Sequence, residues 1–214
     1  MLDRKTYNLI KKKYGKVASW AVWGEVGDTV KSNTDNMDWI KDGNLLRTLN
    51  TSFVFVGLNF SGTHEEGPHR CKVWRNFHSG DNRRQNDFKL RFALLKTRYW
   101  GSYITDLIKN HPDVDSDRVM NYLRENPKEL EKNISSFEKE IALLGGNPVL
   151  VALGVDVYKL LKDHLWHGRK YEIVKVTHYA ARIGKEKYRK ETLGLLTTFH
   201  RKLMRNNRRE LPTN

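Results

Sequence analysis

The stretch Phe53-Val-Phe-Val-Gly57 is short, apolar and rich in residues that favour β-structure, which predicts a buried strand. Similar runs occur at 102–106, 148–153 and 172–177. The residues between these runs show the apolar spacing of helices, most clearly over 127–144. Continuous apolar strands that alternate with amphipathic helices are typical of a parallel sheet with helices on both faces. We therefore predict an α/β fold with a central, mostly parallel, four-stranded sheet.

No internal repeat or linker divides the chain, so we expect residues 1–214 to form one domain. Residues 1–50 are expected to be a helical and irregular segment, with a helix over 3–14, and residues 205–214 a basic tail. The segment 59–86 is long for a loop in a compact domain. Loops of that length are usually functional or disordered.

The chain has a net charge of +14, and most of it lies near the two ends. Residues 1–16 carry a net +5 and residues 182–214 a net +7, whereas 69–101 is locally +7 and is offset by an excess of acids over 106–140. Basic clusters attract polyanions because each neutralised phosphate releases condensed counterions. This distribution predicts a nucleic-acid partner; the alternative is that the basic side chains only keep the protein soluble.

The composition excludes several classes of protein. No apolar run approaches the ~20 residues that cross a bilayer, and residues 1–16 lack the apolar stretch of a signal peptide. Cys71 is the single cysteine, which excludes an internal disulfide and a four-cysteine metal site. His64, His69 and His78 lie near Cys71, but their spacing matches no zinc arrangement. We expect a cytoplasmic protein without membrane contact, metal or cofactor.

Polar side chains follow three of the predicted strands, namely Asn59, Asp106 and His178. In open α/β sheets, ligands bind beyond the C-terminal ends of the strands, so we expect these side chains to converge on one site. No nucleophile with an adjacent base occurs at these strand ends, which argues against acyl-transfer chemistry.

The order of these segments resembles the uracil-DNA glycosylase superfamily. Gly57-Leu-Asn-Phe-Ser-Gly62 is similar to the family's Gly-x-Asn-Pro-Gly motif, and Ser102-Tyr-Ile-Thr-Asp-Leu-Ile-Lys109 to its Val-Tyr-Ile-Thr-Asn strand. The segments 140–154 and 176–182 also fit, the second as a variant of the family's His-Pro-Ser motif. The resemblance covers residues 52–190, which it implies are a glycosylase-like core.

The resemblance implies an enzyme that flips uracil or another deaminated base out of DNA and hydrolyses its N-glycosidic bond. By position in the motifs, Asn59 orients the attacking water, and His178 donates to the base and stabilises the departing anion. Asp106 replaces the family's Asn that reads the edge of uracil. An ionised carboxylate only accepts hydrogen bonds. Either the base is therefore not uracil, or Asp106 is protonated, or this residue has another role.

The resemblance also implies an aromatic residue that stacks on the base, for which Phe77 is the candidate and Phe60 the alternative. Tyr179-Ala180 replaces the family's Pro-Ser, which rests against the DNA backbone. Ser61 and Arg182 are then the candidates for contacts with phosphate groups. The expected partner is DNA, duplex or single-stranded, and we expect a monomer.

Two other functions stay open on the sequence. One is a nucleic-acid-binding protein on the same fold without catalysis, and the other is an enzyme that uses Asp106 as a base on a nucleotide-like substrate. Each candidate residue also has a structural interpretation. Asn59 could cap the next element or hold a turn, and Asp106 could pair with an arginine or cap a helix. His178 could be a hydrogen-bonded residue at the rim, and Phe77 and Trp74 could pack under a loop.

Overall fold

The computed structural model describes residues 2–24, 40, 42–61, 72–78, 86–165 and 171–209. In chain order, its elements are α1 (Arg4–Tyr14), β1 (Ala18–Trp20), α2 (Asp42–Thr48), β2 (Asn50–Asn59), α3 (Asp87–Leu94), β3 (Ser102–Ile108), α4 (Ser116–Glu125), α5 (Pro127–Leu143), β4 (Val149–Leu153), α6 (Val155–Leu165), β5 (Ile173–Val176) and α7 (Lys185–Arg209).

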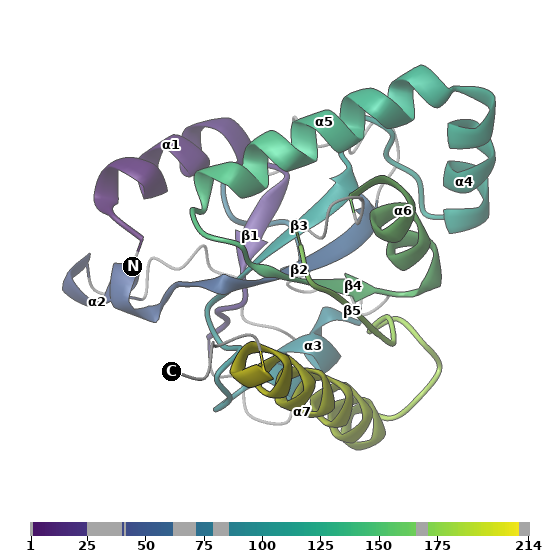
Figure 1. Ribbon diagram of the computed structural model, residues 1–214. Coiled ribbons are helices and arrows are strands. Elements are labelled where there is room, and N and C mark those ends of the chain that lie inside the picture. Colours follow the sequence, from purple (N-terminus) through teal and green to yellow (C-terminus); the bar gives the residue numbers. More distant parts are fainter. Residues whose placement is uncertain are drawn as a thin grey trace.

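The strands form one five-stranded sheet in the order β1-β3-β2-β4-β5 (Figure 1). The four predicted strands are β2 to β5, and all their pairings are parallel. The predicted count of four was wrong because β1 adds an edge strand that pairs antiparallel with β3. With three residues, β1 is too short to show an alternating pattern in the sequence. The sheet is therefore mixed, and the α/β class is confirmed.

Helices cover both faces of the sheet, with α1, α4, α5 and α6 on one side and α3 and α7 on the other (Figure 1). The run in β2 is continuously apolar because its neighbouring residues enter two different cores. Val54 and Val56 pack on the side of α5, whereas Phe53 and Phe55 pack on the side of α3 and α7. A strand that is buried on both faces has no polar face, so apolar and polar residues do not alternate along it.

The chain reverses its direction of winding at β2. It runs from β2 to β3 on one side and then crosses to β4 and β5 on the other side. Such a switch opens a crevice beyond the C-terminal ends of the strands. At this end, Gly57 lies opposite Asp106 and Asn59 lies opposite Ile108.

The two terminal segments are more regular than the sequence indicated. Residues 1–50 contain α1, β1 and α2, and residues 205–209 of the predicted tail belong to α7, whereas 210–214 lie outside the described residues. No helix in the described ranges has the length and apolar character needed to span a membrane.

Candidate functional site

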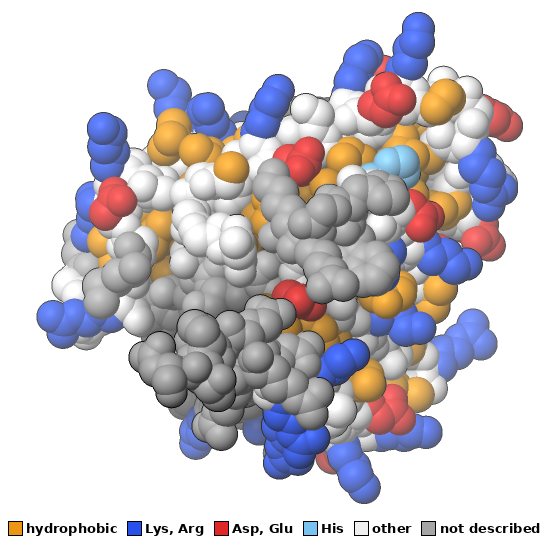
Figure 2. Space-filling model, in the orientation of Figure 1, with side chains coloured by type: hydrophobic (Ala, Val, Ile, Leu, Met, Phe, Trp, Pro, Cys, Tyr) orange, Lys and Arg blue, Asp and Glu red, His pale blue; other side chains and the backbone are white. Residues whose placement is uncertain are grey.

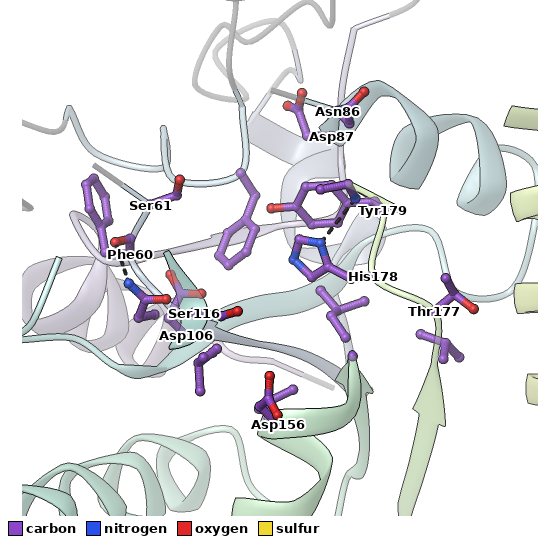
Figure 3. Close-up of a pocket in the computed structure, with 18 of the residues that line it drawn as sticks. Phe60, Ser61, Asn86, Asp87, Asp106, Ser116, Asp156, Thr177, His178 and Tyr179 are labelled. Carbon is purple, nitrogen blue, oxygen red and sulfur yellow. Dashed lines mark hydrogen bonds between the residues drawn. The ribbon is translucent and has the colours of Figure 1, made fainter. Parts of the chain in front are cut away.

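A cavity of about 1070 Å³ lies at the C-terminal edge of the parallel strands (Figure 3). Its walls come from the ends of β2, β3, β4 and β5, from the loop 72–78 and from the first turns of α3, α4 and α6. The candidate site residues that line it are Asn59, Phe60, Ser61, Phe77, Asp106 and His178. Arg182 is exposed and is not among the lining residues. Six of the seven candidates therefore meet at one place.

Asn59 at the end of β2 has a fixed orientation. Its Nδ2 donates to the backbone oxygens of Asp113 (2.8 Å), Phe60 (3.1 Å) and His111 (3.4 Å), which holds the chain between β3 and α4 against the end of β2. The structural interpretation of Asn59 is thus correct in part. Among the described residues no group donates to Oδ1, so this oxygen is left to accept a hydrogen bond from a ligand or a water.

Asp106 lies on β3, next to β2 in the sheet, and is 3 % exposed. Its Oδ2 accepts a hydrogen bond of 2.9 Å from Asn76 Nδ2, and its Oδ1 lies over Gly57 of the neighbouring strand, where any Cβ would overlap with it. Within the described residues Oδ1 accepts no hydrogen bond. Burial raises the pKa of Asp106 to about 7, although the hydrogen bond from Asn76 and the charge of Lys109 act in the opposite direction.

The nearest cation does not neutralise this carboxyl, because it is paired elsewhere. Lys109 Nζ lies 2.7 Å from Oε2 of Glu140, which is fully buried on α5, and it donates to the backbone oxygen of Asp106. Glu140 Oε1 accepts from Tyr103 Oη (2.8 Å) and Thr105 Oγ1 (2.9 Å). The predicted pairing of Asp106 with an arginine is not found among the described residues; an asparagine holds it instead.

His178 follows β5 and faces Asp106 across the cavity (Figure 3). The backbone N–H of Ala180 donates to its Nδ1 at 3.1 Å, so in the neutral ring Nε2 carries the proton. Burial lowers the pKa of His178 to about 4, which keeps the ring neutral near pH 7. Nε2–H therefore points into the cavity as a hydrogen-bond donor without a positive charge.

Tyr179 is a site residue that was not predicted, because in the sequence it stands out only as a departure from the family's His-Pro-Ser motif. Its ring stacks on that of His178, with 4.3 Å between centroids, and its hydroxyl points into the cavity (Figure 3). Burial, with the nearby charges of Asp106 and Asp87, raises the pKa of Tyr179 well above its ordinary value, so the hydroxyl keeps its proton. The position directly after His178 was the signal that could have identified it.

The loop 72–78 forms the aromatic wall and is held in an unusual conformation. Trp74 and Phe77 have φ values of +60° and +66°, a region that residues other than glycine rarely adopt. Phe77 is buried in the core on the side of α3 and α7 and also lines the cavity, and Trp74 is buried and packs against Tyr7 and Trp20. The packing interpretation is therefore correct for both residues. Phe60 closes the cavity on the side of Ser61 (Figure 3).

Asn76 positions both the loop and Asp106, and no sequence signal singled it out. Its Nδ2 donates to Asp106 Oδ2 and to the backbone oxygen of Val17 (2.8 Å), and its Oδ1 accepts from the Phe77 N–H (3.1 Å). The amide orientation is fixed by these three bonds together. Asn76 could be recognised only once Val17, Phe77 and Asp106 were brought together in space.

Among the described residues that line the cavity, acidic side chains outnumber basic ones. The carboxyl groups belong to Asp87, Asp106, Asp113 and Asp156, and the cations are Arg75 and Lys175. Of the described bases in the stretch 69–101, Arg75 alone lines the cavity. Lys89 and Arg91 are buried, and Lys89 Nζ donates to the backbone oxygen of Ala181 at 2.8 Å.

Lys and Arg side chains instead lie at the periphery in Figure 2, over α1 and α5 at the top and over α7 at the bottom. Arg70, Arg83 and Arg84 lie outside the described residues.

The possible zinc ligands His64, His69 and Cys71 also lie outside the described residues. His78 is buried, with Nε2 2.8 Å from Ser19 Oγ, and burial lowers its pKa to about 3. Within the described ranges no group of three His, Cys, Asp or Glu side chains could hold a metal ion. A scan against protein-family models finds no matching family, and searches of curated proteins and of solved structures find no significant match.

Proposed function

We propose that this chain is a DNA N-glycosylase of the uracil-DNA glycosylase type, with β2 to β5 as its glycosylase-like core and β1 as an added edge strand. The observation that carries the proposal is the convergence of Asn59, Asp106 and His178. They come from three different strands, far apart in the sequence, and line one cavity with aromatic walls. By the resemblance, Asn59 orients the attacking water, Asp106 contacts the base and His178 stabilises the leaving group.

The bond to be broken joins C1′ of the sugar to a ring nitrogen of the base. A water held by Asn59 Oδ1 adds to C1′, and the base leaves with the bonding electron pair; the proton that the water loses passes to solvent, from which the base anion takes up one in turn. Asn59 orients this water but does not take its proton, because an amide is not a base at neutral pH. Stabilisation of the departing anion therefore supplies the rate, and His178 Nε2–H is placed to donate to it. One such donor is typically worth about 10²–10³ in rate.

The cavity is suited to a flat, uncharged ring. Phe60 and Phe77 are apolar walls at the same site, and base–aromatic stacking contributes about 1–3 kcal/mol per base. Among the described residues, the carboxylates of Asp87, Asp113 and Asp156 outnumber the cations of Arg75 and Lys175, which opposes the entry of a phosphate group. This charge balance favours a base with its phosphates outside the cavity over a free nucleotide, and so favours a glycosylase over the nucleotide-converting alternative.

Base release from synthetic DNA tests the proposal. Single-stranded and duplex oligonucleotides that carry uracil, hypoxanthine or xanthine are incubated with enzyme in excess, and abasic sites are cleaved with alkali and counted. We expect release by the wild type and a loss of at least about 100-fold in Asn59→Ala and in His178→Ala. Asn121→Ala, on the exposed face of α4, is the matched control and should keep the wild-type rate.

No release from any of these substrates overturns the glycosylase proposal. If DNA then binds with an affinity that falls steeply with salt, the non-catalytic nucleic-acid-binding alternative is correct.

A further inference from the structure

The carboxyl group of Asp106 is a polar group of the cavity whose chemistry depends on its protonation state near neutral pH. It is buried in the sheet, Oδ2 is held by Asn76, and Oδ1 lies over Gly57 at the cavity. The absence of a side chain at Gly57 is what makes room for Oδ1. The hydrogen bond from Asn76 and the open position at Gly57 thus fix the orientation of the carboxyl group at the cavity.

The groups around Asp106 do little to stabilise a negative charge. Lys109 Nζ is bound to Glu140, and the carboxylate of Glu140 opposes ionisation of Asp106. Asn76 is the single donor found on the carboxyl within the described residues. The other titratable side chains of the surrounding elements are Arg75 and His78 of the loop 72–78, His178 and Tyr179 after β5, and Asp87 of α3.

Burial without a dedicated counter-ion favours the neutral acid. The pKa of about 7 for Asp106 agrees with this geometry and leaves a large share of the group protonated at neutral pH. Of its neighbours, His178 is uncharged, because burial lowers its pKa to about 4, and so is His78, with a pKa of about 3. Tyr179 keeps its proton because its pKa is raised. Within this set, Asp106 is therefore the group expected to titrate between pH 6 and pH 8.

A protonated carboxyl and a carboxamide offer the same pattern, one donor beside one acceptor, whereas an ionised carboxylate offers acceptors alone. Because Asn76 donates to Oδ2, this oxygen is the acceptor and the proton of the neutral acid is on Oδ1. The lactam edge of uracil, hypoxanthine or xanthine fits this order, with its C=O against Oδ1 and its N–H against Oδ2. In the same pose cytosine and adenine present an amino group and an unprotonated ring nitrogen, so donor and acceptor are interchanged.

We propose that Asp106 binds the flipped-out base as a neutral carboxylic acid and thereby selects bases with a lactam edge, with a recognition that is lost when the carboxyl ionises. This inference rests on the proposed function, because it concerns a base in the same cavity. It accounts for an aspartate at a position where uracil recognition calls for an amide. It also distinguishes Asp106 from a general base, which must be ionised to act.

The test compares wild type with Asp106→Asn, which keeps one donor and one acceptor but cannot titrate, and with Asp106→Ala. Single-turnover release of uracil from single-stranded DNA is measured from pH 6 to pH 8.5. A group with a pKa of about 7 loses about 30-fold of its neutral form over this range. We expect the wild-type rate to fall about 30-fold relative to that of Asp106→Asn, and Asp106→Ala to be inactive throughout.

Two results overturn the inference while leaving the glycosylase proposal intact. One is an Asp106→Asn variant that is inactive at every pH although the wild type is active, which makes Asp106 a proton-transfer group. The other is a rate of uracil release that changes with pH in the same way for the wild type and for Asp106→Asn. Absence of uracil release by the wild type at every pH instead contradicts the proposed function.

A binding measurement tests the inference without catalysis. Free uracil and free cytosine are titrated into the wild type and Asp106→Asn and followed by NMR. We expect uracil to bind the wild type more weakly at pH 8.5 than at pH 6, whereas its binding to Asp106→Asn should not depend on pH. At pH 6, cytosine should bind both proteins much more weakly than uracil does. Binding of uracil that is equal at the two pH values in the wild type, or no binding at all, overturns the inference. The aspartate ¹³C carboxyl spectrum provides a check that needs no ligand, because a signal titrating near neutral pH must be absent from Asp106→Asn.

Discussion

Replacing Asp106 by Asn should make the protein increasingly stable relative to wild type as the pH rises from 4 to 8. The raised pKa of Asp106, about 7 against an ordinary value of 3.8, means that the folded state binds this proton more tightly than the unfolded state does. The resulting stabilisation is fully present below the unfolded-state pKa and is lost as the pH rises through the folded-state pKa. The window for this effect therefore runs from about pH 4 to about pH 7, and acid favours the folded state.

The magnitude follows from the separation of the two pKa values. At about 1.4 kcal/mol for each pH unit, Asp106 makes the wild type about 4 kcal/mol less stable at pH 8 than at pH 4, apart from the other titrating groups. The carboxamide does not ionise and keeps the hydrogen bond with Asn76. The free energy of unfolding of Asp106→Asn, relative to wild type, should therefore rise by about 4 kcal/mol between these pH values.

Urea denaturation followed by circular dichroism at pH 4, 6 and 8 measures this difference. Asp156→Asn, at the first turn of α6 in the same cavity, is the control for the loss of one negative charge. Asn76→Ala removes the donor that lowers the pKa of Asp106. In this variant the loss of stability caused by Asp106 should therefore continue to a higher pH than in the wild type. A relative stability of Asp106→Asn that is the same at pH 4 and pH 8 would refute the argument that this carboxyl is buried without compensation.

Three further predictions concern the groups around this carboxyl. Gly57→Ala puts a Cβ against Asp106 Oδ1, so it should lower stability by about 1–3 kcal/mol and abolish uracil binding; unchanged binding by NMR contradicts this. Lys109→Met leaves the buried Glu140 without its counter-ion, so the free energy of unfolding measured with urea should fall by about 3–5 kcal/mol. Adding Glu140→Gln to this variant should restore part of the loss, and additive effects of the two substitutions would argue against the ion pair. His178→Gln, which retains an N–H donor, should release uracil faster than His178→Ala; equal rates mean that His178 donates nothing to the base.

The inner parallel strands were predictable because they are buried on both faces. In β2, Val54 and Phe55 enter cores on opposite sides of the sheet, so the strand appears in the sequence as an uninterrupted apolar run. The rule that ligands bind at the C-terminal ends of such strands then predicted a convergence of Asn59, Asp106 and His178, and the cavity bears this out. Their chemical roles stay predictions.

The charge pattern was less informative, because net charge does not tell which side chains reach the surface. Lys89 and Arg91 belong to the basic stretch 69–101, yet both are buried on α3. Lys89 is used to hold the backbone of Ala181, three residues after His178. A side chain that contributes to the basic stretch in the sequence therefore supports the turn that carries the candidate catalytic histidine.

The aromatic wall could not be predicted because its supports lie more than fifty residues away in the chain. Trp74 N–H donates to Gly15 O at 2.6 Å, Ser19 Oγ donates to Trp74 O at 3.1 Å, and Asn76 Nδ2 donates to Val17 O. These bonds compensate the unfavourable φ values of the loop 72–78, which would not persist in isolation. Gly15, Val17 and Ser19 lie in the segment 1–50, outside the motif-bearing residues 52–190. The loop that presents Phe77 and holds Asp106 is thus built on the N-terminal segment, and the cavity depends on residues that no motif in the sequence marks.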